Sequence, residues 1–143
     1  MYGESASQAP ASRPLPQITP LNKPFWDFAR ERVFSIQVCE DCGDAHLPEA
    51  PVCPNCLSRN QSWTPVSGEA TLESWVDFYR AYWPCFADSL PYRVCLVRLK
   101  EGPLFVSNLV GGDADLSIGT RLKVVFEPVS DDVVLPLFAL AGD

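Results

Sequence analysis

The sequence has few basic side chains and almost no histidine. It contains 11 Lys and Arg against 18 Asp and Glu, which gives a net charge of -7 at pH 7, and it has 1 His. Nucleic-acid binders attract phosphates through clustered Lys and Arg, so this charge balance argues against a nucleic-acid partner. A single histidine also restricts histidine-based catalysis to one general base.

Long apolar runs are missing as well. No stretch approaches the roughly 18 apolar residues that span a bilayer, so we expect no membrane segment. The first residues, Met1–Ser5, lack the basic and apolar regions of a secretory signal. Together with the cysteine pattern described below, these observations predict a cytoplasmic protein in a reducing compartment.

Residues 1–20 are rich in proline and poor in large aliphatic side chains. Four prolines lie among Ser, Ala and Gln, at Pro10, Pro14, Pro16 and Pro20. Such a segment buries too little apolar surface to offset its ordering entropy, so we predict a flexible or polyproline-like arm. An unstructured tail and an arm that wraps around a partner both fit this composition.

A short helix is predicted after the arm. Asn22 can cap it, and Pro24 fits its first turn, where a missing N–H costs little. Trp26 lies beside the apolar stripe of this helix, where it either widens the stripe or is presented to another chain. The stripe itself consists of residues at helical spacing, namely Phe25, Phe28 and Ala29.

The strongest motif is a pair of Cys-x-x-Cys knuckles, formed by Cys39 with Cys42 and by Cys53 with Cys56. Such knuckles turn four thiolates toward one point, and Zn²⁺ takes four such ligands tetrahedrally. An iron–sulfur cluster, rubredoxin-like iron, and disulfides in an oxidising compartment are the competing interpretations. We predict Zn²⁺ at this site.

The number of ligands determines what the metal can do. Four thiolates leave no open position for water or substrate, so the Zn²⁺ is expected to be structural. His46 lies between the two cysteine pairs and is predicted to be a solvated loop residue rather than a ligand. A strand is predicted over 33–38, and the proline-containing stretch 39–56 is predicted to form loops.

From Glu69 onward the chain alternates with a period of two, which is typical of strands. Trp75 lies on the more polar side of the first strand. The more apolar side is expected to comprise Ala70, Leu72, Ser74, Val76 and Phe78. Further strand-like runs cover 92–100, 104–109, 122–127 and 133–140, with turns at Gly102-Pro103 and Gly111-Gly112-Asp113. Since no helix-length segment separates these runs, they predict a small antiparallel barrel or sandwich.

The sequence contains no catalytic motif: no nucleophile elbow, phosphate loop or zinc-protease pattern. Cys95 lies in an apolar strand and is expected to be a core residue, whereas Cys85 lies in a loop after Pro84. We therefore predict no catalytic residue. This absence indicates a subunit of a larger assembly rather than an enzyme.

An aromatic stretch covers residues 78–86, where five of the nine side chains are aromatic. One interpretation is a lid of core aromatics over the barrel. The other is a protein interface or a mouth for an apolar ligand, because aromatic side chains are enriched at such surfaces.

The order of these motifs resembles the DUF35 family, whose members have a rubredoxin-like zinc ribbon followed by an OB-fold. The similarity covers about residues 21 to 140. It rests on the two cysteine knuckles and on an ordered set of short motifs, namely Pro24–Trp26, Ser67-Gly68, Pro91-Tyr92, 96–99, 107–109, 124–127 and 135–138. The expected fold is therefore mostly β, with a flexible Pro-rich arm at 1–20, an N-terminal helix and zinc ribbon at 21–66, and a small antiparallel OB-fold barrel at 67–143.

The resemblance implies a non-catalytic partner of a thiolase-fold enzyme that acts on acyl-CoA thioesters. That enzyme is expected to be an acyltransferase or an aldolase that shortens steroid side chains, and the family protein stabilises it, shapes its acyl-CoA site and bridges to a neighbouring enoyl-CoA hydratase. By position, the four knuckle cysteines are the zinc ligands, and the loop 79–90 lies near the partner or ligand entrance. The expected partner or ligand contacts are Trp26, Tyr79, Arg80, Tyr82, Trp83 and Phe86.

One departure from the family bears on CoA binding. Many members carry Pro-Pro-Arg after the first knuckle, where this chain has Pro48, Glu49 and Ala50. The missing cation weakens the alternative of a stand-alone acyl-CoA-binding protein, whose phosphate contacts would be Lys23, Arg80 and Arg93. A single-stranded nucleic-acid-binding OB protein is a further alternative, which the acidic charge disfavours.

Overall fold

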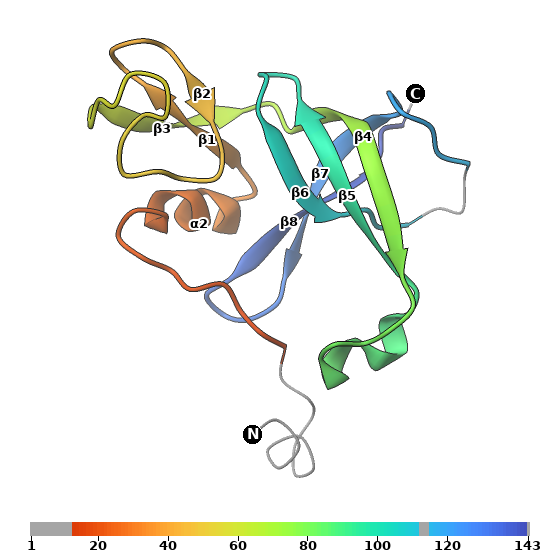
Figure 1. Cartoon of the computed structure of the whole chain (residues 1–143). Helices are drawn as coiled ribbons and strands as arrows, with labels where there is room; N and C mark the ends of the chain where they lie inside the picture. The colour runs from red at the N-terminus through yellow and green to blue at the C-terminus, as the bar shows by residue number, and fades with distance from the viewer. Residues whose placement is uncertain (1–12, 112–114, 143) are drawn as a thin grey trace.

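The computed structural model describes residues 13–111 and 115–142 (Figure 1). Residues 1–12 of the predicted arm, and Gly112 and Asp113 of one predicted turn, lie outside the described residues. None of the helices in the described part is long and apolar enough to cross a membrane. The elements are α2 (Lys23–Arg30), β1 (Phe34–Cys39), β2 (Ala45–His46), β3 (Gln61–Val66), β4 (Glu69–Phe78), η1 (Pro84–Ser89), β5 (Tyr92–Leu99), β6 (Leu104–Asn108), β7 (Arg121–Pro128) and β8 (Val134–Leu140).

The N-terminal part is a three-stranded antiparallel sheet with strand order β2-β1-β3, and α2 packs against it (Figure 1). β1 pairs with β3 from Phe34 opposite Val66 to Cys39 opposite Gln61. The sequence did not indicate β3. The short strand β2 also corrects the prediction that 39–56 contains only loops, because it pairs with Gln37 and Val38 of β1.

The C-terminal part is a five-stranded antiparallel sheet with strand order β6-β5-β4-β7-β8. Its two outer strands meet, which nearly closes the sheet into a barrel: Leu109 forms a parallel bridge with Phe138, and the Val110 N–H donates to the Phe138 carbonyl at 2.8 Å. Ser107 Oγ donates to the Pro136 carbonyl at 2.9 Å across the same seam. The predicted mostly β fold with a small antiparallel barrel is confirmed.

A β-bulge in β4 reverses the predicted alternation of side chains. The register with β5 shifts between Leu72 and Ser74. Because a bulge inserts one extra residue, every later side chain changes face. Trp75 consequently packs against the core, and Val76 is 55% exposed. The predictions that Val76 belongs to the apolar side and Trp75 to the polar side were therefore wrong.

The helix α2 begins where it was expected, with Pro24 in its first turn. Asn22 occupies the cap position, but its side chain makes no capping hydrogen bond. Instead, the Asn22 side-chain oxygen accepts from the Thr19 N–H at 2.7 Å, and its amide donates to Glu49 Oε2 at 3.2 Å. The predicted cap is thus wrong: Asn22 ties the approach to the helix to the ribbon loop.

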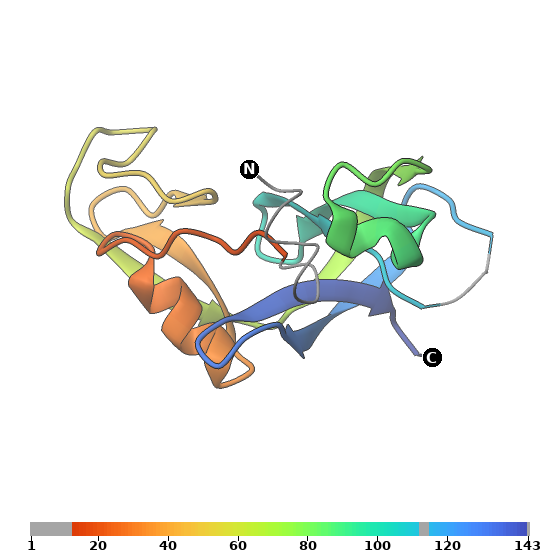
Figure 2. The ribbon, with the colours of Figure 1, turned by 90° about the horizontal axis from the view of Figure 1, so that it is seen from below.

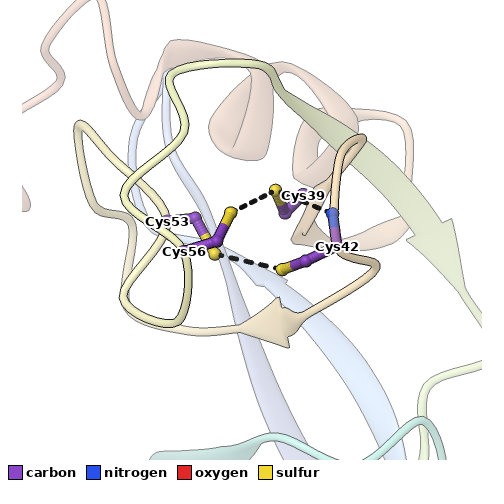
Figure 3. Close-up of side chains that lie close together, drawn as sticks. All are labelled: Cys39, Cys42, Cys53 and Cys56. Atoms are coloured by element: carbon purple, nitrogen blue, oxygen red, sulfur yellow. Dashed lines mark hydrogen bonds between the residues drawn. The ribbon is translucent and has the colours of Figure 1, made fainter.

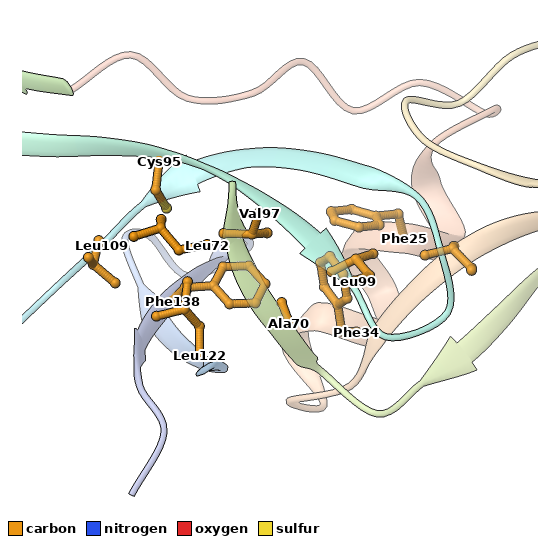
Figure 4. Packing of buried hydrophobic residues seen from close by; sticks show 11 residues of the cluster. Phe25, Phe34, Ala70, Leu72, Cys95, Val97, Leu99, Leu109, Leu122 and Phe138 are labelled. Atoms are coloured by element: carbon orange, nitrogen blue, oxygen red, sulfur yellow. The ribbon is translucent and has the colours of Figure 1, made fainter. Parts of the chain in front are cut away.

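The ribbon part and the barrel share one hydrophobic core (Figure 4). Phe34 of β1 lies 5.1 Å from Phe105 and 6.1 Å from Phe138, measured between ring centroids. Phe25 of α2 lies 5.8 Å from Phe34. The buried members of this core are Phe25, Phe34, Ile36, Ala70, Leu72, Cys95, Val97, Leu99, Leu109, Leu122 and Phe138.

Gly68 connects the two parts and has no room for a side chain. Its φ is +79°, and a Cβ placed on it would lie 2.3 Å from Cγ1 of Val124. The Gly68 carbonyl accepts the Val124 N–H at 2.9 Å. Only glycine permits both this backbone conformation and this close approach.

Candidate metal centre and partner surface

The four knuckle cysteines converge on one point (Figure 3). Cys39 ends β1, Cys42 follows in the adjoining turn, and Cys53 and Cys56 come from the loop before β3. All four Sγ atoms lie within 4.8 Å of one another. The Sγ atoms of Cys39 and Cys56 are 3.6 Å apart, as are those of Cys42 and Cys53.

This arrangement fits a tetrahedral metal ion. With a Zn–S distance of about 2.3 Å, a tetrahedral site places its sulfur atoms roughly 3.8 Å apart. The observed 3.6 Å separations are close to that value. The four cysteines can therefore hold a single Zn²⁺ with little movement.

Neighbouring N–H groups donate to the sulfur atoms of three of these cysteines. The Cys42 N–H donates to Cys39 Sγ at 3.4 Å, and the Asn55 N–H donates to Cys53 Sγ at 3.3 Å. The side-chain amide of Asn55 donates to Cys42 Sγ at 3.4 Å and is the main cause that lowers the pKa of Cys42 to about 7. Sequence analysis did not identify Asn55 as a contact of the cysteine cluster, although its position between Cys53 and Cys56 could have indicated it.

His46 is buried beside the metal-binding loops and does not belong to the cysteine cluster. Its Nδ1 lies 3.1 Å from Asp44 Oδ2, and its Nε2 lies 3.0 Å from Gln37 Oε1. Gln37 Oε1 also accepts the Ala50 N–H at 2.8 Å, so this network joins β1, β2 and the following loop. The prediction of a solvated loop residue was wrong, because His46 lies in β2, where it is buried and pairs with Gln37 of β1.

The aromatic stretch divides into a packed and an exposed part. Phe78 stacks on Tyr92 with ring centroids 5.1 Å apart, and Phe86 in η1 lies 5.8 Å from the same ring. Tyr79 and Tyr82 are 74% and 60% exposed. The Arg80 guanidinium lies 5.2 Å from the Tyr82 ring centroid. This segment is therefore both a lid on the barrel and an aromatic surface with one cation.

Trp26 lies away from this aromatic surface. It is half-buried and contacts Phe25 edge-on at 5.0 Å between ring centroids. It lines a mainly apolar groove of about 800 Å³ between α2, the loop 47–49 and the barrel strands β6 and β8. Phe86 lines another hollow, where Arg13 of the N-terminal segment lies over its ring at 5.3 Å. The structure does not bring Trp26 and the 79–86 segment together.

Comparisons with known proteins agree with this architecture. The rubredoxin-like zinc ribbon domain of ChsH2 matches residues 26–60, and the C-terminal OB-fold domain of ChsH2 matches residues 63–127. A DUF35 domain-containing scaffold protein from Pyrococcus furiosus is 33% identical over 110 residues, which cover 75% of this chain and 79% of that protein. The chain belongs to the DUF35/ChsH2 family.

Further relatives of this DUF35 protein extend the comparison. A probable enoyl-CoA hydratase alpha subunit from Thermomonospora curvata is 32% identical over 137 residues, covering 94% of this chain and 42% of that protein. The chain thus spans less than half the length of this relative. The Ltp2-ChsH2(DUF35) aldolase contains a chain with a TM-score of 0.79 and 29% identity, with coverage of 88% of this chain and 98% of that one. A DUF35 protein of unknown function from Sulfolobus solfataricus, with a TM-score of 0.60 at 13% identity, shows the same fold.

The family match also bears on the metal. The cysteine cluster of this DUF35 protein lies in the region that matches a rubredoxin-like zinc ribbon. Within the described ranges, it is the one group of His, Cys, Asp and Glu side chains that could hold a metal ion. The cluster and the family together indicate a structural metal.

Two of the candidate phosphate contacts are engaged in ion pairs. Lys23 Nζ lies 2.7 Å from Asp27 Oδ2. Arg93 binds Asp77 through two hydrogen bonds of 2.6 and 3.2 Å, which hold the pKa of Asp77 below its ordinary value. Arg80, exposed beside Tyr82, is the candidate that keeps its guanidinium at the surface.

The two cysteines outside the ribbon differ in environment. Cys95 is buried in the core as predicted, and this burial raises the pKa of its thiol to about 11. A thiol held in this neutral form is a poor nucleophile. Cys85 is half-buried in η1 and lines the hollow beside Phe86.

Proposed function

We propose that this DUF35 protein is a non-catalytic accessory subunit of a thiolase-fold acyl-CoA enzyme of the aldolase type. The observation that carries the proposal is the similarity to a chain of the Ltp2-ChsH2(DUF35) aldolase, which extends over 88% of this chain and 98% of that one. Because the match includes both ribbon and barrel, it supports a shared way of binding a partner. The partner would supply the nucleophile and the base.

Zn²⁺ bound by Cys39, Cys42, Cys53 and Cys56 would serve the fold of the ribbon. Four sulfur ligands complete a tetrahedral coordination sphere, so water and substrate find no open position. Metal binding of this kind contributes on the order of 10 kcal/mol to folding. The ion would thereby hold the ribbon loops in one conformation, ready to contact the partner.

The aromatic surface formed by the exposed Tyr79, Arg80 and Tyr82 and the half-buried Trp83 is the proposed contact with the enzyme. Tyr, Trp and Arg dominate the binding energy of protein interfaces. Trp26 and Phe86 border the two hollows on the barrel and are proposed to lie near the acyl-CoA of the shared site. An acyl-CoA thioester with a steroid side chain is the proposed substrate of the partner, with an enoyl-CoA hydratase as a second neighbour in the cytoplasm.

The ion pairs of Lys23 and Arg93 disfavour the stand-alone acyl-CoA carrier. Binding a CoA phosphate at either cation would require breaking a contact with a carboxylate of the same chain. We therefore place the acyl-CoA at the interface with the enzyme. The organisation into an arm at 1–20, a helix and ribbon at 21–66 and a barrel at 67–143 is part of this proposal.

Co-expression with a thiolase-fold subunit, sought among the genes adjacent to the gene for this chain, tests the proposal. We expect a complex in size-exclusion chromatography with light scattering, and cleavage of a carbon–carbon bond in the acyl chain of an acyl-CoA by the pair but not by this chain alone. Tyr82→Ser should weaken the complex at least tenfold, whereas the control Ile118→Ser, which removes an even more exposed apolar side chain, should not. Full activity and solubility of the enzyme without this chain would refute the proposal, as would turnover by this chain alone.

A further inference from the structure

The second cysteine knuckle ends on a leucine in a backbone conformation that favours glycine. Gly43 follows the first knuckle with a φ of +82°, and Leu57 follows the second with a φ of +67°. A non-glycine residue pays a steric cost in this left-handed region, and a bulky apolar residue there is a true outlier. The backbone of the second knuckle therefore does not explain why leucine occupies this position.

Packing does not explain it either. The Leu57 side chain is 72% exposed and lies outside the hydrophobic core. A leucine that is both strained and exposed stabilises neither the knuckle nor the core. Strain that brings no stability often marks a functional contact.

The position of Leu57 is nevertheless fixed by hydrogen bonds. Its N–H donates to the Cys53 carbonyl at 2.8 Å, and the Cys53 N–H donates to the Ser58 carbonyl at 2.8 Å. The Ser58 hydroxyl donates to the carboxylate of Asp41 in the first knuckle. A residue whose backbone is already fixed loses less conformational entropy when its side chain binds a partner.

The first knuckle, which is hydrogen-bonded to the residue after this leucine, carries exposed acidic side chains. Asp41 is exposed and is joined to Ser58, the next residue after Leu57, and Glu40 is exposed beside it. Arg59, two residues after Leu57 in the sequence, is an exposed cation. The ribbon thus presents an exposed apolar side chain next to a knuckle with two exposed carboxylates, Glu40 and Asp41. The complementary surface of a partner is an apolar socket with a basic rim.

We propose that Leu57 is an apolar anchor that inserts into a basic-rimmed socket on the thiolase-fold subunit; this inference rests on the proposed function. The ribbon loops and η1 lie at opposite ends of the molecule in both views (Figures 1 and 2). The anchor is therefore a second point of contact, separate from the aromatic surface. Two separated contacts fix the orientation of a rigid subunit better than either alone.

The test measures binding of the full chain, loaded with Zn²⁺, to the purified thiolase-fold subunit by isothermal titration calorimetry. Leu57→Asn keeps a residue that tolerates the left-handed region but removes the apolar group, so we expect at least tenfold weaker binding. Leu57→Met, which retains an apolar side chain, should bind within threefold of the wild type. The control Ile118→Asn, at a position that is 75% exposed, should bind within twofold.

Stability and salt dependence separate an anchor from a structural role. Leu57→Asn should unfold at a Tm no lower than that of the wild type, because the exposed side chain contributes little packing. Glu40→Gln should reduce the association rate about threefold at low salt and flatten its salt dependence.

Each outcome decides the matter. Unchanged affinity of Leu57→Asn in a complex that forms normally would overturn the anchor and leave the proposed function standing. A lower Tm of Leu57→Asn would show that the leucine supports the fold instead. No binding by the wild-type chain would overturn both proposals.

Discussion

Replacing Gly68 by alanine tests how the ribbon is joined to the barrel. The φ of +79° costs a side chain about 1–2 kcal/mol, and a new methyl group 2.3 Å from Val124 Cγ1 adds about 1–3 kcal/mol of overpacking. We therefore expect Gly68→Ala to lower the free energy of unfolding by about 3 kcal/mol. For a chain of this length, that loss lowers Tm by about 10 °C.

A matched control separates the two contributions. Gly111 has a φ of +75°, and a Cβ there would meet no atom within 4 Å. Gly111→Ala should therefore lose only the backbone term of about 1–2 kcal/mol. Urea denaturation of both variants, with Zn²⁺ present, measures the difference.

Equal losses in the two variants would refute the reasoning, because they would show that Val124 yields to the new methyl group at no cost. The same two variants can also be compared in their affinity for the thiolase-fold subunit. If Gly68 fixes the angle between ribbon and barrel, Gly68→Ala should also weaken a complex that uses contacts on both. Gly111→Ala should leave that affinity unchanged.

Two further predictions concern cysteines. Cys53→Ser should abolish stoichiometric zinc binding, as measured by elemental analysis. Amide hydrogen exchange should accelerate at the knuckles, for example at Gly43, while the amide of Ile36 stays protected by the shared core. Loss of protection across the barrel would contradict this prediction. Burial holds the thiol pKa of Cys95 at about 11, so above pH 9 the thiol ionises more readily in the unfolded chain. Stability should therefore fall by about 2 kcal/mol between pH 9 and pH 11. A Cys95→Ala variant that loses as much stability over this range would exclude this cause.

Local signals in the sequence predicted much of the fold and the metal site. The spacing of the knuckles predicted a cluster of four cysteines, because two tight turns suffice to aim four thiolates at one point. The helix followed from Pro24 and the apolar stripe, and the barrel strands followed from alternation and turn residues. Each of these signals lies within a few consecutive residues.

What the sequence did not reveal depends on contacts between distant segments. β3 contains polar residues and Pro65 and has no alternation, and its pairing with β1 defines it as a strand. The bulge in β4 depends on the register with β5, so Val76 could not be placed on the correct face from β4 alone. His46 lies nearer in sequence to its partner Gln37, but the turn and proline residues of 39–56 did not indicate the strand β2 that pairs the two residues.

The core shared by ribbon and barrel limits how this family can recombine. Cutting the chain between Val66 and Ser67 would separate Phe34 from Phe105 and Phe138. Neither fragment would then contain a complete hydrophobic core. A ribbon transplanted onto a foreign barrel would need matching aromatic rings there. The two halves should consequently be inherited together, with substitutions at their junction arising in compensating pairs.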